Sequence, residues 1–124
     1  MGLTEAFKEA ARDRPDEIAV VFDSCRFTWT QFLNRVSRLA AVLRANGVAS
    51  GDRVIMLANS SHRYIEFYYA TLWAGGLFVP LNARLALPEL IEQTRDADPV
   101  VLLIDASFAT LAGEIVRATK RLTR

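Results

Sequence analysis

The residues best suited to chemistry lie near the middle of the chain, where the only histidine, His62, follows Ser60 and Ser61. A serine can become a nucleophile when a histidine takes its proton and a carboxylate orients that histidine. No neighbouring Asp or Glu is placed to orient His62. We therefore expect Ser60 to cap a helix and His62 to lie in its first turn, and we predict no catalytic residue.

Metal binding has even less support in the sequence. One histidine, one cysteine (Cys25) and scattered carboxylates do not give the spacing of a ligand set, so no metal-binding residue is predicted. A single cysteine also excludes an internal disulfide, which is typical of a reducing compartment. Because the first ten residues show neither a signal peptide nor a myristoylation pattern, we expect the protein to be cytoplasmic.

The glycine pair Gly75-Gly76 suggests a nucleotide-binding loop at first sight. Such loops follow a strand and open a helix, so that backbone amides point at phosphate. Here the order is reversed, and the pair is predicted to end a helix and to allow close packing on a sheet. The turn at residues 59–61 does follow a strand and open a helix, but it contains neither glycine nor lysine and is a weak candidate for anion binding.

Three further polar residues, Asn82, Arg84 and Arg95, are placed near the carboxyl end of a predicted strand or on the helix after it. Ligands of open α/β sheets bind at that end. We nevertheless expect Asn82 to shape a turn, and Arg84 and Arg95 to be solvated or ion-paired. The sequence thus predicts no cofactor-binding residue.

Length and charge limit the function further. The chain has 124 residues, enough for one domain, with 14 acidic and 15 basic side chains. This balance gives no electrostatic reason to expect a nucleic-acid partner, and the basic C-terminal end is interpreted as a solvated helix face (Arg117, Lys120, Arg121 and Arg124). No transmembrane segment is expected, because Glu66, the glycine pair and Pro80 interrupt the apolar stretch at residues 64–81.

The first third of the chain predicts two helices and a hairpin. Apolar residues at helical spacing indicate an opening helix that ends before Pro15, and β-branched and aromatic runs at residues 18–22 and 27–29 indicate a small hairpin. Thr28 and Gln31 then form a predicted capping box. The helix that they begin has a buried apolar stripe and ends at Gly47 (Phe32, Val36, Leu39 and Leu43).

The rest of the chain predicts a parallel sheet. Apolar runs at residues 54–58, 77–81 and 100–104 are typical of strands buried on both faces, and the segments at 61–74 and 88–95 are long enough to be crossover helices. A last helix is indicated by Phe108, Leu111, Ile115 and Leu122. The predicted fold class is therefore α/β, with a short β-hairpin and a three-stranded parallel sheet.

Two features of this layout indicate an incomplete core. The helix from residue 61 carries apolar side chains around most of its circumference, and a three-stranded sheet leaves two open edges. We expect residues 1–124 to be a single incomplete domain. More protein, from the same gene or a partner, would then cover the helix between Tyr64 and Trp73.

Two longer motifs carry a family resemblance. FTWTQF from Phe27 resembles a core motif in which Gln31 replaces the usual Glu, and GDRVIMLANSSHRYIEFYYATLWAGGLFVPLNARL from Gly51 resembles a second. With RPDEIAVVF before them, they are similar to the N-terminal portion of the adenylate-forming (AMP-binding) acyl-CoA synthetase superfamily. Asn82, where amino-acid adenylating domains commonly carry Asp, favours the acyl-CoA ligase branch over luciferases and peptide-synthetase adenylation domains. Ala86-Leu87-Pro88 departs from the family's usual hydroxyl N-cap, a cost of about 1 kcal/mol.

The resemblance implies a reaction that this chain does not house in full. The family uses ATP, Mg²⁺ and CoA to convert a carboxylate into an acyl-adenylate and then an acyl-CoA, and it places the phosphate loop, the adenine contacts and the catalytic lysine beyond the matched region. We expect the chain to be an N-terminal fragment of a carboxylic acid:CoA ligase, inactive alone and without a bound cofactor. The alternative is a free-standing, non-catalytic α/β module that binds a protein partner.

Overall fold

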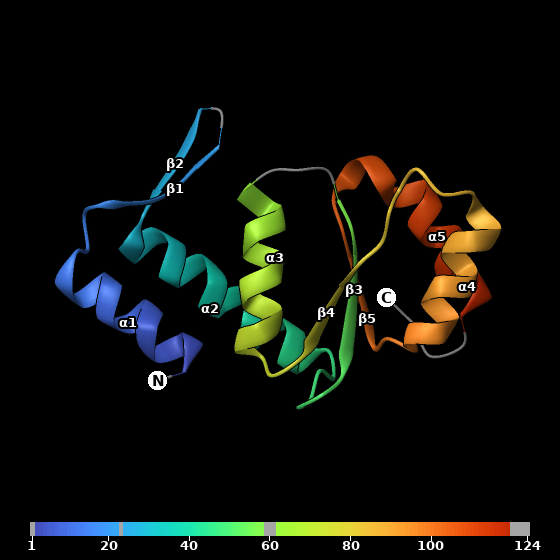
Figure 1. The fold of residues 1–124 in the computed structure, drawn as a ribbon, viewed down its shortest axis with the longest axis horizontal. Coiled ribbons are helices and arrows are strands. Elements are labelled where there is room, and N and C mark those ends of the chain that lie inside the picture. The colour runs from blue at the N-terminus through green and yellow to red at the C-terminus, as the bar shows by residue number, and fades with distance from the viewer. Residues whose placement is uncertain (1, 23, 59–61, 120–124) are drawn as a thin grey trace.

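The computed structural model describes residues 2–22, 24–58 and 62–119 (Figure 1). The elements in chain order are α1 (Leu3–Asp13), β1 (Ile18–Phe22), β2 (Cys25–Thr28), α2 (Trp29–Ala45), β3 (Arg53–Leu57), α3 (His62–Trp73), β4 (Leu77–Pro80), α4 (Leu87–Ala97), β5 (Val101–Ile104), a 3-10 turn η1 (Ala106–Phe108) and α5 (Ala109–Ala118). The predicted turn at 59–61, and Lys120, Arg121, Leu122 and Arg124 of the predicted C-terminal helix, lie outside the described residues.

The predicted α/β fold is confirmed. β3, β4 and β5 form a parallel sheet in the order β4-β3-β5, and β1 and β2 form a separate antiparallel hairpin. Helices α2 and α3 pack on one face of the parallel sheet, and α4 and α5 on the other (Figure 1). The sheet is therefore the middle layer of three.

The central strand β3 explains why the sheet needs both layers. Val54, Ile55, Met56 and Leu57 are all within 1% of complete burial. Because successive side chains of a strand point to opposite faces, Val54 joins the core under α2 and α3, while Ile55 and Leu57 join the core under α4 and α5. A continuous apolar run is what a strand covered on both faces requires.

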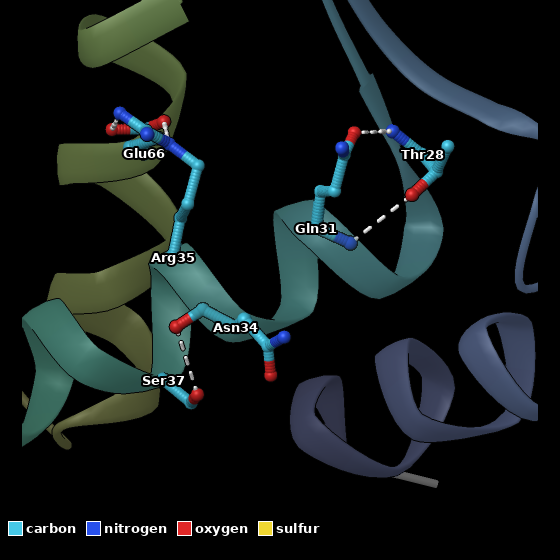
Figure 2. Close-up of polar contacts among 6 residues, drawn as sticks. All are labelled: Thr28, Gln31, Asn34, Arg35, Ser37 and Glu66. Carbon is cyan, nitrogen blue, oxygen red and sulfur yellow. Dashed lines mark hydrogen bonds and ion pairs between the residues drawn. The ribbon is translucent and has the colours of Figure 1, made fainter.

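The hairpin differs from its prediction at one end. The second strand is β2, Cys25–Thr28, and Trp29 belongs to α2 rather than to the strand. The reason is the predicted capping box, which is confirmed (Figure 2): Gln31 N donates to Thr28 Oγ1 at 3.2 Å, and Thr28 N donates to Gln31 Oε1 at 2.9 Å. These two bonds start the helix immediately after Thr28.

Helix α3 is buried or half-buried around most of its circumference: among its described side chains, only Arg63, Tyr68 and Leu72 are exposed. Glu66, Ala70 and Thr71 are buried, whereas Tyr68 and Leu72 are 41% and 38% exposed. The cover comes from α2, from the sheet and from α1, whose Phe7 ring lies 4.9 Å from that of Tyr69, so a narrow strip of α3 remains open to solvent. Among the described residues, no helix is long and apolar enough to cross a membrane.

Candidate functional site

The sequence candidates around His62 do not form a described site. His62 begins α3, as the sequence predicts, but its side chain, Ser60 and Ser61 lie outside what the structure describes. The same holds for the weak anion-binding turn at 59–61. Cys25 lies on the hairpin, far along the chain from any other candidate. Within the described residues, no three His, Cys, Asp or Glu side chains are grouped as a metal site would require.

The glycine pair is a structural joint, as predicted. Gly75 has a φ of 89°, and the amides of Gly75 and Gly76 donate to the carbonyls of Leu72 and Thr71, which is a Schellman C-cap. A Cβ on Gly76 would lie 3.1 Å from the Asp52 carbonyl oxygen. The first glycine is needed for its left-handed backbone and the second for close approach to the strand, so neither amide is directed at a ligand.

The polar residues after β4 have structural partners. Asn82 Oδ1 accepts from Arg84 N at 3.0 Å, so Asn82 shapes the predicted turn. Arg84 has an exposed side chain, and Arg95 is exposed as well. The prediction for Arg95 is incomplete, however, because its Nε and Nη2 donate to the Ala118 carbonyl at 3.2 and 3.1 Å. Arg95 therefore ties α4 to the carboxyl end of α5, where a positive charge is favourable.

Sequence reasoning missed a charged cleft at the carboxyl end of β5. The cleft has a volume of about 470 Å³ and lies between α2, the first turns of α3 and η1. Its charged lining consists of three guanidinium groups and two carboxylates (Arg35, Arg38, Arg63, Glu66 and Asp105). This is the end of a parallel sheet at which ligands of α/β proteins bind, and strand order reverses between β3 and β5, as at other such sites.

The best-defined contact in the cleft is a two-point ion pair between α2 and α3 (Figure 2). Arg35 Nε donates to Glu66 Oε1, and Arg35 Nη2 donates to Glu66 Oε2 at 3.2 Å. The side chain of Glu66 is 7% exposed and that of Arg35 is 43% exposed. The hydrogen bond from Glu66 raises the pKa of Arg35, which burial lowers in part, so this guanidinium stays charged at any working pH.

Two further contacts fix the walls of the cleft. The Arg35 guanidinium carbon lies 4.6 Å from the ring centre of Phe27, which holds the hairpin against α2. Across the cleft, Asp105 Oδ1 accepts from Ser107 N at 3.0 Å and also from the Ser107 hydroxyl, and this caps η1. The first turn of α3 carries no acidic residue.

The charged side chains of the cleft determine which kind of group it can bind. Three guanidinium groups against two carboxylates favour a carboxylate or phosphate group over a cation. The described lining contains no histidine, serine, cysteine or lysine, and its two carboxylates are held by Arg35 and by Ser107. The cleft can hold or position an anionic group, but it does not provide the groups of a catalytic centre.

Comparison with known proteins finds matches to one family of enzymes. The family model described as "AMP-binding enzyme" matches residues 7–123. Feruloyl-CoA synthase of an Amycolatopsis species is 38% identical over 112 residues, which cover 86% of this chain and 23% of that protein. Peroxisomal benzoate–CoA ligase of Arabidopsis thaliana is 33% identical over 107 residues, which cover 86% of this chain and 18% of that protein.

The fold agrees with these sequence matches. A crystal structure of a long-chain fatty-acid CoA ligase, assigned as putative, from Rhodopseudomonas palustris superposes with a TM-score of 0.91 and 27% identity, over 98% of this chain and 31% of that one. The chain thus spans about a fifth of the length of the curated relatives and under a third of this solved structure.

Proposed function

Because this chain belongs to the AMP-binding enzyme family, we propose that it forms the N-terminal part of a carboxylic acid:CoA ligase. In the proposed reaction of the whole protein, a carboxylate oxygen attacks the α-phosphorus of ATP and pyrophosphate leaves. The thiolate of CoA then attacks the acyl carbonyl carbon and AMP leaves. The observation that carries the proposal is the family match over residues 7–123, and the names of the feruloyl-CoA and benzoate–CoA relatives support this reaction class.

We assign a scaffolding role to residues 1–124 within that reaction. The described glycine pair caps a helix and does not form a phosphate loop, and the two carboxylates of the Arg35 cleft are engaged by Arg35 and Ser107. The described side chains do not fit a Mg²⁺ site either, because the grouped carboxylates that Mg²⁺ prefers are missing from this part of the chain. No step of the reaction is therefore assigned to these residues, and the chain alone is proposed to be inactive.

A chimaera tests the proposed family role directly. Residues 7–119 of this chain would replace the matched segment of the Amycolatopsis feruloyl-CoA synthase, and formation of feruloyl-CoA from ferulate, ATP and CoA would be measured. We expect a soluble chimaera with measurable synthesis, because the two segments are 38% identical and we assign no catalytic group to them. A soluble, cooperatively folded chimaera without any adenylation of ferulate would contradict the proposal.

One observation favours the second candidate, a free-standing module that binds a protein partner. Tyr68 and Leu72, one helical turn apart, are 41% and 38% exposed on the side of α3 that faces solvent. Exposed apolar side chains of this size are typical of an interaction surface when they adjoin one another. Sedimentation of the purified chain separates the candidates: a compact monomer with a sharp thermal transition favours the free-standing module, whereas self-association or a broad transition favours the ligase fragment.

The cellular compartment of the protein is a separate proposal. We propose that the protein is cytoplasmic, as the single cysteine suggests. The Arabidopsis benzoate–CoA ligase is named as peroxisomal, so a peroxisomal location is the alternative to test. Cell fractionation of the complete gene product with cytosolic and organelle markers decides between these locations.

A further inference from the structure

The lining of the charged cleft between α2, α3 and η1 carries one more positive than negative side chain. Arg35 donates to both carboxylate oxygens of Glu66, and Asp105 Oδ1 accepts from the backbone N and the hydroxyl of Ser107. Each carboxylate therefore has a donor of its own within the protein, and a ligand need not supply one. What the cleft offers to a ligand is positive charge.

Two further guanidinium groups flank the Arg35–Glu66 pair from different helices. Arg38 follows Arg35 by three residues on α2, and Arg63 precedes Glu66 by three residues on α3, so each lies one helical turn from the pair. Both residues are exposed, and both line the cleft. A ligand in the cleft can therefore be contacted by one guanidinium group from each helix.

This pair of guanidinium groups distinguishes a phosphate from a carboxylate. A guanidinium group can bind two oxygens at once through parallel N–H bonds. A carboxylate has only two oxygens, which one guanidinium group occupies, whereas a phosphate monoester has three and carries a charge of about −1.5 to −2 at neutral pH. Arg38 and Arg63 together therefore match a phosphate group better than a carboxylate.

The cleft has room for more than the phosphate itself. Its volume of about 470 Å³ is much larger than a phosphate group. Leu39 of α2, Phe67 of α3 and Ile104 of β5 contribute apolar side chains to the lining, and all three are half-buried. An organic group attached to the phosphate would remove part of this apolar surface from water, which is favourable.

We propose that the cleft binds a small organic phosphate monoester, with its phosphate held by Arg38 and Arg63 and its apolar part against Leu39 and Phe67. This site is independent of the proposed function, because none of these residues is assigned a step of the ligase reaction. The proposal rests on the charge, the exposure and the lining of the cleft.

Titration of the isotope-labelled chain with phenyl phosphate, at constant ionic strength, tests the proposal. The amide resonances of Arg38, Arg63 and Asp105 would give the dissociation constant, which is compared with those of benzoate and inorganic phosphate. We expect phenyl phosphate to bind about fivefold more tightly than either. Benzoate lacks the third oxygen, and inorganic phosphate lacks the apolar group.

Substitutions of two arginines make the test specific to the cleft. Arg38→Gln should weaken the binding of phenyl phosphate about fivefold while the circular dichroism spectrum stays unchanged. Arg12→Gln is the matched control, because Arg12 is an exposed arginine of α1 outside the cleft lining, and it should change the dissociation constant by less than about twofold. Arg38→Lys keeps the charge but loses the paired N–H bonds, so its affinity should lie between those of the wild type and Arg38→Gln.

Three results would overturn the proposal. Equal dissociation constants for Arg38→Gln and Arg12→Gln would show that phenyl phosphate does not bind in the cleft. Benzoate binding as tightly as phenyl phosphate would overturn the choice of a phosphate, and inorganic phosphate binding as tightly would overturn the organic group. None of these results bears on the ligase assignment, which the chimaera tests separately.

Discussion

The two faces of the parallel sheet are built from different side chains. The face under α2 and α3 is rich in aromatic residues: the ring of Phe7 lies 5.5 Å from that of Phe32 and 4.9 Å from that of Tyr69. The face under α4 and α5 is mainly aliphatic, with Ile55, Leu90 and Ile115 completely buried. Among the described residues, five exposed large apolar side chains lie on the aromatic side or its hairpin (Ile18, Val21, Val42, Tyr68 and Leu72). The sixth, Leu77, lies on the face of β4 that carries Val79 and Leu81 of the aliphatic core.

The two helix layers also differ in how completely they cover their apolar side chains. The aliphatic layer covers most of its core, since α4 and α5 themselves leave no large apolar side chain exposed among the described residues and Leu77 of β4 is the exposed exception there. The aromatic layer relies on specific ties across long sequence distances, such as the Arg35–Glu66 pair and the bond from Arg44 Nη2 to the Trp73 carbonyl at 2.7 Å. We therefore expect the rest of a ligase domain, or a partner, to contact the aromatic side. The following predictions test this contrast.

The largest effect is expected from removal of a core side chain on either face. Phe32→Ala should lower the free energy of unfolding by about 3–5 kcal/mol, and Leu90→Ala by about 2–5 kcal/mol. Phe32 is 2% exposed and Leu90 0% exposed, so neither cavity is open to water. Denaturant unfolding, followed by tryptophan fluorescence and by far-UV circular dichroism, measures both changes.

The two probes also test whether the faces fold together. Trp29 and Trp73 both pack with the aromatic core, so fluorescence reports that face, whereas circular dichroism reports all helices. Coincident transitions in both variants mean one cooperative unit. If Phe32→Ala shifts only the fluorescence transition, the two layers unfold independently of each other.

A smaller loss is expected from the ion pair that joins α2 to α3. Glu66→Gln removes the buried carboxylate and leaves Arg35 with one weaker acceptor. Loss of a fully buried partner costs about 3–5 kcal/mol, but the Arg35 side chain is 43% exposed and solvent screens the remaining charge, so we expect about 1–2 kcal/mol.

A surface pair serves as the matched control for this substitution. Arg12 and Asp13 lie 3.3 Å apart with side chains 70% and 64% exposed, and Asp13→Asn should change the free energy of unfolding by less than about 0.5 kcal/mol. Thermal or urea unfolding at neutral pH gives both values. Equal changes for Glu66→Gln and Asp13→Asn would show that the cleft pair contributes no more than a surface contact.

The smallest effects are expected at the helix N-caps, where the two faces again differ. Thr28→Ala removes the capping box of α2 and should destabilise the chain by about 1 kcal/mol. Ala86, the N-cap of α4, has an extended backbone and no side-chain cap. Ala86→Ser would pair with Glu89 as a capping box and should stabilise by about 0.5–1 kcal/mol. A neutral result at position 86 in thermal unfolding would contradict the reading of α4 as an uncapped helix.

Local signals in the sequence predicted what local chemistry determines. Thr28 and Gln31 indicated a capping box, and the glycine pair indicated a helix end, because in each case the interacting groups lie within a few residues of one another. The three apolar strands were likewise visible from their composition. Their spatial order, β4-β3-β5, was not, since it depends on which faces the crossover helices cover.

The charged cleft could not be predicted from the sequence, because its residues come from distant segments of the chain. Arg35 and Glu66 are 31 residues apart, and the apolar stripe predicted for the helix after Thr28 does not include Arg35. Glu66 was expected merely as an interruption of an apolar stretch, yet it faces α2 and is nearly buried. The nearest signal was a lone acidic residue within an apolar helix, which indicates a paired charge but does not identify the partner.

The most direct test of the central claim, that this chain is a structural part of a ligase and not a ligase itself, is ATP–pyrophosphate exchange by the purified chain. The assay would use labelled pyrophosphate, ATP, Mg²⁺ and a panel of aromatic and aliphatic carboxylates, with full-length feruloyl-CoA synthase and ferulate as the positive control. We predict no carboxylate-dependent exchange above the rate without protein. Exchange that depends on a carboxylate and rises in proportion to the chain would contradict the account.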